Sequence, residues 1–210
     1  MNIGDYAPLM KAPHRMDLMV SAMTKQGSWH CNQKCVHCYA AGQVLSDEEE
    51  LSTDDWKKIL DNCRDACIPQ VTFTGGEPTM REDLFELISY ARWFISRLNT
   101  NGIRLTPDYC KKLRKAELDS VQITFYSADP DDHNRLVGAA RYEDTLAGIK
   151  NAVAQGLSVS INTPLCTVNR DYVKTLELLH PLVVCCAFCV VKHPFQVRRG
   201  AHVSRTPGSS

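Results

Sequence analysis

HCNQKCVHCYAAG, residues 30–42, gathers three cysteines in a short loop and decides how the rest of the chain is interpreted. The cysteines follow a Cys-x3-Cys-x2-Cys spacing, with no fourth cysteine nearby: Cys31, Cys35 and Cys38. A structural zinc site needs four ligands, so His30 or His37 would have to supply the last one. A four-iron cluster held by three cysteines keeps its fourth iron open for another ligand. The spacing favours the iron–sulfur site, and a zinc-binding module remains the alternative.

Length and charge limit the classes of function. A chain of 210 residues favours one domain with a sizeable core. Its 24 Lys and Arg balance its 24 Asp and Glu, so electrostatics gives no reason to expect nucleic acid or membrane as a partner. No run of about 20 apolar residues predicts a membrane span, and the N-terminus lacks the apolar core of a secretory signal. We expect a cytoplasmic protein, in which clustered thiols more often bind metal than form disulfides.

Strand and helix patterns alternate along most of the chain. This alternation predicts a parallel sheet with helices outside it. Right-handed crossovers would curl the sheet into a partial parallel (β/α)6 barrel, and a barrel that is incomplete after the fifth βα unit is the alternative. The run from Asp129 to His133 is expected to be a solvated surface loop. Strands are predicted at about 16–23, 68–76, 93–102, 120–127, 157–165 and 182–191, and helices at about 54–67, 81–91, 106–118, 142–155 and 169–180.

The two ends differ from the middle. We predict an N-terminal extension over 1–15, a core barrel over 16–191 and an irregular basic tail over 192–210. Although the chain has 24 acidic residues, none lies between Leu178 and Ser210. A disordered tail, a truncated chain and a shifted reading frame after His180 are the three interpretations. Three further thiols lie in an apolar run and are read as buried strand residues: Cys185, Cys186 and Cys189.

The cysteine loop and the later run Gly75-Gly76-Glu77-Pro78 together resemble the radical S-adenosylmethionine (radical SAM) enzymes. This resemblance implies that the three loop cysteines ligate a [4Fe–4S] cluster, whose open iron chelates S-adenosylmethionine for one-electron cleavage. Over about residues 16–180 the chain is most similar to peptide-modifying and cofactor-maturing members. Those members usually carry a C-terminal SPASM-type domain with auxiliary clusters, which we expect this chain to lack. The resemblance implies a peptide or peptide-derived substrate and a reducing partner such as flavodoxin or ferredoxin.

The same resemblance implies the cofactor contacts. The Gly75–Pro78 run would hold the methionine end, because glycines allow close approach and an ionised Glu77 accepts from an ammonium. His37 would lie near the adenine, with the backbone of Tyr39 at the adenine edge. Four further residues match positions that contact ribose, adenine or carboxylate: Thr124, Ser127, Arg135 and Asn162. A truncated chain that binds the cluster but no longer turns over substrate remains a second alternative.

Overall fold

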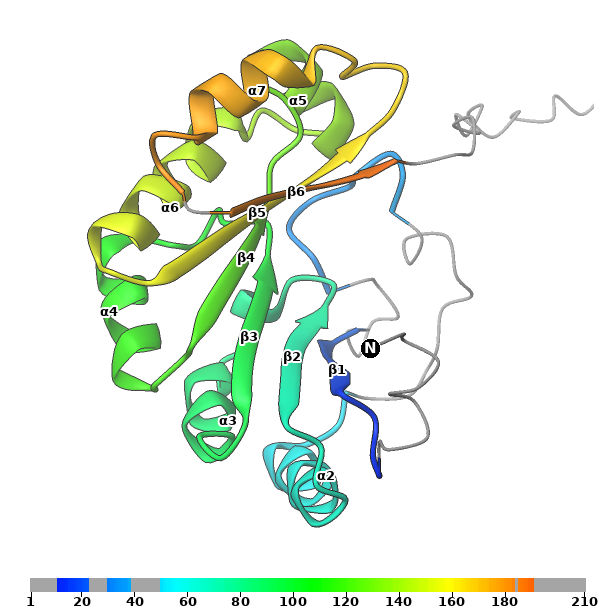
Figure 1. Cartoon of the computed structure of the whole chain (residues 1–210), viewed down its shortest axis with the longest axis vertical. Helices are drawn as coiled ribbons and strands as arrows, with labels where there is room; N and C mark the ends of the chain where they lie inside the picture. The colour runs from blue at the N-terminus through cyan, green and yellow to red at the C-terminus, as the bar shows by residue number, and fades with distance from the viewer. Residues whose placement is uncertain (1–10, 23–29, 39–49, 184, 191–210) are drawn as a thin grey trace, which may run out of the picture.

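The computed structural model describes residues 11–22, 30–38, 50–183 and 185–190, and these form one curved sheet with helices on its outer side (Figure 1). Neighbouring strands are parallel and follow the chain order from β1 to β6, which confirms the predicted partial barrel. The strands are β1 (Arg15–Ser21), β2 (Gln70–Gly75), β3 (Ile95–Thr100), β4 (Ser120–Thr124), β5 (Ser158–Leu165) and β6 (Cys185–Val190). The helices are α2 (Thr53–Asp65), the short 3-10 helix η2 (Pro78–Met80), α3 (Leu84–Tyr90), α4 (Pro107–Lys115), α5 (Pro130–Val137), α6 (Tyr142–Ala154) and α7 (Tyr172–Leu179).

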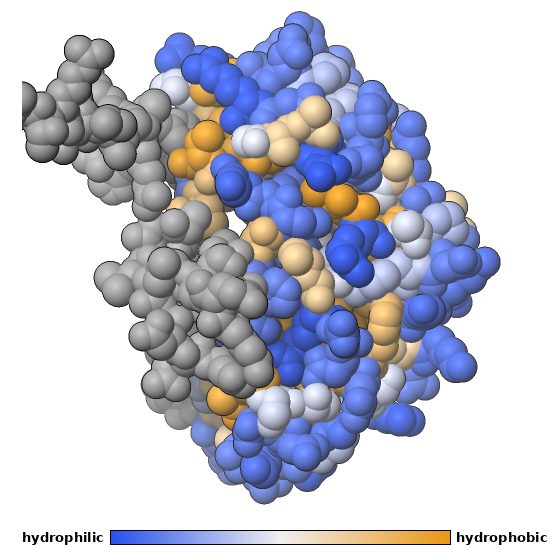
Figure 2. Space-filling model, turned by 180° about the vertical axis from the view of Figure 1, so that it is seen from behind, coloured by the Kyte–Doolittle hydropathy of each residue, from blue (hydrophilic) through white to orange (hydrophobic). Residues whose placement is uncertain are grey.

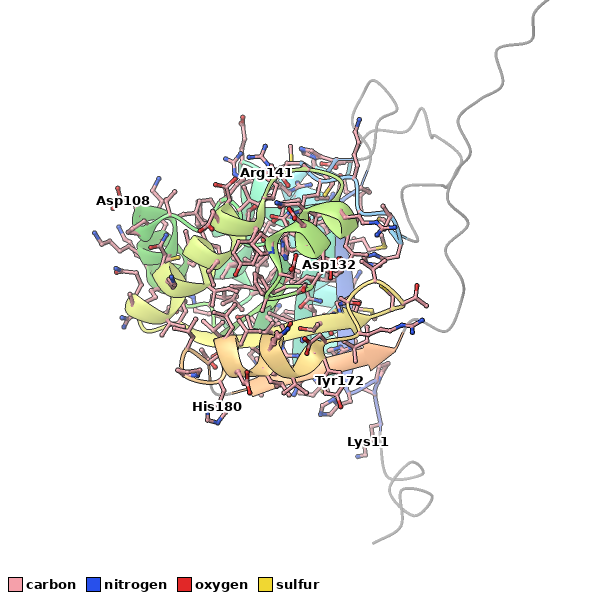
Figure 3. The ribbon with its side chains drawn as sticks, turned by 90° about the horizontal axis from the view of Figure 1, so that it is seen from above. Lys11, Asp108, Asp132, Arg141, Tyr172 and His180 are labelled. Carbon is pink, nitrogen blue, oxygen red and sulfur yellow. The ribbon has the colours of Figure 1, made fainter. Side chains whose placement is uncertain are left out.

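Local sequence signals explain where the helices begin. The hydroxyl of Ser52 accepts a hydrogen bond from the backbone of Asp55 at 3.2 Å and caps α2. Thr106 caps α4 in the same way, and Pro107 occupies the first turn, where its missing N–H costs nothing. Figure 3 shows the outer helices from above, with Asp108 on α4, Asp132 on α5 and Tyr172 on α7.

The two faces of the sheet differ in polarity because alternate side chains of a strand point to opposite sides. One face packs against the helices and carries buried apolar residues such as Phe73, Leu98 and Ile123. The opposite side, called here the concave face, is polar. Its residues are Thr72, Thr74, Arg97, Asn99, Gln122, Thr124, Ser160 and Asn162.

The prediction of a solvated surface loop at Asp129–His133 was right in that Asp129 and Asp131 are exposed, but it was wrong about the backbone, because α5 begins here. Asp129 caps α5 by accepting hydrogen bonds from the backbones of Asp131 and Asp132, and Gly138 ends the helix in the left-handed region. His133 faces inward and is 0% exposed. An acidic cap followed by proline is a helix-start signal, and the acidic composition obscured it.

The sixth strand was predicted correctly and pairs with β5. Cys186 is partly buried against the hydrophobic core, as a strand thiol is expected to be. Among the described residues, no helix has the length and apolar character needed to cross a membrane. Seen from behind, the described surface is largely hydrophilic with small scattered apolar groups (Figure 2). The domain limits stay predictions, since residues 1–10 and 191–210 lie outside the described part.

Candidate functional site

The three loop cysteines lie on the segment 30–38, which runs along the arrowheads of the strands in Figure 1. All three are free and half-buried. Burial is the main reason that the pKa of Cys31 is raised to about 11 and that of Cys35 to about 12, and neighbouring thiols contribute in the same direction. Since burial disfavours the thiolate, metal coordination is needed to stabilise this form here.

The two histidines of the cysteine loop each contact a side chain of another segment. Nδ1 of His30 lies 2.9 Å from Oε1 of Glu50, and Nε2 of His37 lies 2.9 Å from the Tyr126 hydroxyl. A tetrahedral zinc site needs four ligands, so one of these histidines would have to join the three thiols. Three cysteines are enough for a four-iron cluster whose fourth iron stays open.

The start of the cysteine loop is fixed to the end of β1 and to the glycine-rich turn. The carbonyl of His30 accepts hydrogen bonds from the Ser21 hydroxyl and from the Glu77 backbone, both at 2.9 Å. The N–H of His30 donates to the carbonyl of Ala22 at 2.8 Å. These bonds place Cys31 directly beside the strand ends, where parallel α/β folds bind their ligands.

The middle of the loop is fixed to the C-terminal end of α5. The backbones of Lys34 and Val36 donate to the last carbonyls of that helix, those of Val137 and Leu136, at 3.2 and 3.0 Å. A side chain at Gly138 would bring its Cβ within 2.6 Å of the Lys34 carbonyl. The helix that the sequence interpretation missed is thus one of the two supports of the cysteine loop.

Gly75 lies where the backbones of β1 and β2 approach each other closely. Its φ is +134°, and a Cβ there would lie 1.9 Å from the carbonyl oxygen of Ser21. The N–H of Gly76 donates to this same oxygen at 2.6 Å. This close approach is one structural reason for a glycine at position 75, and its contact with the cofactor stays a prediction.

Glu77 is 1% exposed and its carboxylate accepts four hydrogen bonds within the protein. Oε1 accepts from the backbone and hydroxyl of Thr79 at 3.0 and 2.6 Å and from the Thr100 hydroxyl at 2.7 Å. Among the described residues, Oε2 accepts from the backbone of Asn101 only, at 2.8 Å. An ionised carboxylate has about four lone-pair sites, two on each oxygen. Oε2 therefore retains acceptor capacity for one more donor.

The loop after β3 joins the glycine-rich turn to the cysteine loop. The amide of Asn101 donates to Oδ1 of Asn32 at 2.7 Å, while its backbone holds Glu77. Pro78 begins η2 and is buried beside them. Sequence reasoning treated residues 99–102 as a turn or a cofactor-side loop without choosing. The strand-end position of Asn101 was the only signal for its role.

The remaining predicted contacts lie on three elements. Thr124 and Asn162 are register partners on β4 and β5 and share the concave face. Ser127 is 5% exposed and its hydroxyl accepts from the backbone of Asp129 at 3.0 Å. Arg135 is exposed near the C-terminal end of α5. Tyr39 lies outside the described residues.

Tyr126 is a site residue that sequence reasoning assigned only to a strand. It is 5% exposed, and its ring lies edge-on to that of His37 with centroids 5.0 Å apart. Cys35 packs against the small cluster that Tyr126 forms with Leu136 and Val137. Burial lowers the pKa of His37, which favours the neutral imidazole beside this phenol.

Comparison with known proteins agrees with this geometry. The profile of the Radical SAM superfamily matches residues 30–179. This chain belongs to the radical SAM superfamily. Membership implies a [4Fe–4S] cluster and S-adenosylmethionine as the cofactors of the domain. The three half-buried thiols and the spare acceptor on Glu77 fit these groups.

The curated relatives of this radical SAM domain have several activities. The chain is 34% identical over 156 residues to the Fe-coproporphyrin III synthase of Methanosarcina barkeri, covering 73% of this chain and 38% of that protein. It is 36% identical over 153 residues to a probable GTP 3',8-cyclase of Methanopyrus kandleri, covering 71% and 48%. The chain thus spans less than half the length of these two relatives.

Solved radical SAM structures share the fold. Streptococcus suis SuiB bound to S-adenosylmethionine matches with a TM-score of 0.73 and 19% identity, covering 89% of this chain and 42% of SuiB. Native anSMEcpe with bound AdoMet and Cp18Cys peptide matches with a TM-score of 0.67 and 16% identity, covering 84% and 50%. At these identities the likeness shows the arrangement of strands and helices.

Proposed function

We propose that this radical SAM domain reductively cleaves S-adenosylmethionine at a [4Fe–4S] cluster held by Cys31, Cys35 and Cys38, and so starts radical chemistry on a peptide or peptide-derived substrate. The observation that carries the proposal is the double anchoring of the cysteine loop, to the glycine-rich turn and to α5. When bound, the cluster and S-adenosylmethionine supply the electron and the carbon radical. The residues of the chain bind and orient these groups.

Each residue of the site has a proposed part. Oε2 of Glu77 would accept from the methionine ammonium, since Oε1 already has three donors. His37 would flank the adenine together with the Tyr39 backbone. The ribose, adenine and carboxylate contacts would come from Thr124, Ser127, Arg135 and Asn162. An electron carrier such as flavodoxin or ferredoxin would reduce the cluster in the cytoplasm.

The peptide substrate is supported by the polarity of the concave face. Backbone amides of a peptide need hydrogen-bond partners when they are buried. Three side-chain oxygens on the concave face are buried without such a partner among the described residues: those of Thr72, Asn99 and Ser160. SuiB and anSMEcpe have each been solved with a peptide bound, which is a property of those proteins.

A polar, anionic small molecule is the second candidate substrate. Arg97 lies on the concave face opposite Thr72, and its Nε donates to the Ser120 hydroxyl at 3.4 Å. A guanidinium at this place suits a carboxylate or phosphate group. The curated relatives are named for porphyrin and GTP chemistry, and both kinds of molecule carry such anions.

The proposed cleavage is tested by anaerobic reconstitution with iron and sulfide, followed by dithionite reduction in the presence of S-adenosylmethionine. Iron, zinc and 5′-deoxyadenosine are quantified for the wild type and for the triple variant with alanine at positions 31, 35 and 38. Cys67→Ala, an exposed thiol outside the loop, is the matched control. We expect iron and deoxyadenosine in the wild type and the control only.

Other outcomes separate the alternatives. Zinc without iron would restore the zinc-module interpretation. A four-iron signal that shifts with S-adenosylmethionine, without deoxyadenosine, would support the impaired cluster-binding chain. Adding GTP, iron coproporphyrin III or an acidic peptide to an active preparation then separates the substrate classes. The class that increases deoxyadenosine formation is the one that the concave face accepts.

A further inference from the structure

The carboxylate of Glu50 lies between the end of β1 and the start of the cysteine loop. Its Oε1 accepts a hydrogen bond from the backbone of Ala22 at 2.7 Å and lies 2.9 Å from Nδ1 of His30. An ionised carboxylate can only accept, so Nδ1 of His30 carries the hydrogen of this contact. Hydrogen bonds to a charged acceptor are the stronger ones in proteins. One oxygen atom of Glu50 thus links the strand end to the residue directly before Cys31.

Arg81 supports Glu50 from the segment that follows η2. Its side chain is 8% exposed, and its Nη1 lies 3.8 Å from Oε2 of Glu50. The same guanidinium donates to the carbonyls of Val20 and Leu51 at 3.0 and 2.9 Å and pairs with the carboxylate of Asp83. These partners belong to β1, to the segment before α2 and to the segment before α3. The guanidinium therefore holds three segments together beside Glu50.

The backbone of His30 connects Glu50 to both parts of the candidate site. The carbonyl of His30 accepts from the backbone N–H of Glu77 at 2.9 Å, and the next residue along the chain is Cys31. A rotation of His30 would move Cys31 and release the backbone of Glu77. The contact of the imidazole with Glu50 restrains this rotation, because it fixes the side-chain end of the same residue.

We propose that Glu50 is a positioning residue that acts through His30 and sets the distance between Cys31 and Glu77. This inference rests on the proposed function, in which one S-adenosylmethionine molecule has to contact the cluster on the loop and the Glu77 carboxylate together. A displacement of about 1 Å in such an arrangement can cost about 100-fold in rate. Glu50 and Arg81 would remove this freedom before the cofactor binds.

The first test measures amide hydrogen exchange by mass spectrometry in the protein without a cluster, on peptides that cover 30–38 and 75–80. Glu50→Leu removes both acceptor oxygens, whereas Glu50→Gln keeps an amide oxygen for His30 and Ala22. Glu86→Leu is the matched control, because Glu86 is exposed and pairs with Lys57 at the surface. We expect faster exchange of both peptides in Glu50→Leu only. Wild-type exchange in Glu50→Leu would overturn the inference.

The second test measures the affinity for S-adenosylmethionine in the reconstituted proteins, from the change that it causes in the electron paramagnetic resonance spectrum. Glu50→Leu should bind about 10–100-fold more weakly per loaded cluster, and Glu50→Gln should bind nearly as well as the wild type. His30→Phe removes the Nδ1 donor and should weaken binding to a similar extent. Because the two residues act in series, the double variant should lose no more than either single variant. Additive losses would overturn the inference.

The two tests separate this inference from the proposed function. A wild type that loads no four-iron cluster or binds no S-adenosylmethionine would defeat the proposed function. Equal affinities in the wild type and in Glu50→Leu would defeat only the positioning role of Glu50. If a variant fails to load iron, hydrogen exchange in the protein without a cluster still decides, because it does not depend on loading.

Discussion

At the scale of single residues, His133 is a buried histidine whose pKa differs strongly from that of an exposed one. It is 0% exposed and packs among the rings of Phe125, Tyr126 and Tyr142. Its Nδ1 accepts from the backbone of Tyr126 at 3.4 Å, and its Nε2 is buried with no hydrogen-bond partner in the described part of the chain. Burial lowers the pKa of His133 to about 4, so the imidazole is neutral in the folded protein.

This lowered pKa makes stability dependent on pH. The unfolded chain takes up the proton at a pKa of about 6.5, and the folded chain only at about 4. The free energy of unfolding should therefore fall by about 3 kcal/mol as the pH drops from 6.5 to 4, with no contribution above 6.5. His133→Gln keeps a hydrogen-bond acceptor without titrating. Urea unfolding at pH 7 and pH 4 should show a smaller loss in this variant; an equal loss would disprove the assignment.

The buried carboxylate of Glu77 gives a second prediction at this scale. The carboxylate of Glu77 accepts from four donors, so the NH2 group in Glu77→Gln would face a donor with no acceptor between them. We expect the free energy of unfolding to fall by about 1–3 kcal/mol. We also expect weaker binding of S-adenosylmethionine. Glu86→Gln is the control, since Glu86 is exposed and pairs with Lys57 at the surface. The free energy of unfolding of Glu86→Gln should fall by less than about 1 kcal/mol. Equal unfolding free energies for the two variants would contradict the role of Glu77 in holding the turn.

At the scale of elements, periodicity and capping signals were sufficient for six strands and for most helices. Hydrophobic runs bounded by turns predicted β2 to β5, and the helices predicted from about 54 and 106 agree with α2 and α4. The contacts between helices, strands and loops could not be predicted from the sequence. His37 and Tyr126 are 89 residues apart, and only the folded sheet brings them together. No sequence pattern indicated that the backbone of Asn101 binds the Glu77 carboxylate. A turn at the end of a strand has the same residue types whether or not it binds a carboxylate.

The junction of α5 with the cysteine loop predicts the effect of Gly138→Ala. Gly138 has φ +72°, and its added Cβ would lie 2.6 Å from the rigid carbonyl of Lys34. We expect a loss of about 1–2 kcal/mol in stability together with lower iron loading. Gly156→Ala is the matched control, because its φ is +71° but the added Cβ faces the flexible end of Arg114 at 3.2 Å. It should lose stability and still load iron fully. Equal iron content in both variants would argue against the junction.

At the scale of the whole molecule, the two faces of the sheet have different roles. The helix side holds the core, whereas the concave face buries polar atoms that lack partners in the described part of the chain. Thr72 is the most buried example on this face, at 2% exposure. An unpaired buried hydroxyl costs free energy, and an apolar group of the same shape does not.

Thr72→Val should therefore leave the free energy of unfolding unchanged or raise it by about 1 kcal/mol in the absence of ligands. Thr79→Val is the opposite case, because the Thr79 hydroxyl donates to Glu77 at 2.6 Å. The free energy of unfolding of Thr79→Val should therefore fall by about 1–3 kcal/mol. Thermal unfolding of both variants provides the comparison. A destabilised Thr72→Val would mean that the hydroxyl already has a partner in the folded protein.

In the part of the chain that the structure describes, the strand order runs from β1 to β6 and the two end strands do not pair, which has a mechanical consequence. A closed barrel has a fixed circumference, so its interior has a fixed width. In a fan of six strands, each neighbouring pair contributes a twist of roughly 20–25°, and small changes in these angles add up across the sheet. The gap between β1 and β6 can widen in this way without breaking a ladder hydrogen bond. Such widening would enlarge the opening without breaking the backbone bonds that anchor the cysteine loop beside the strand ends.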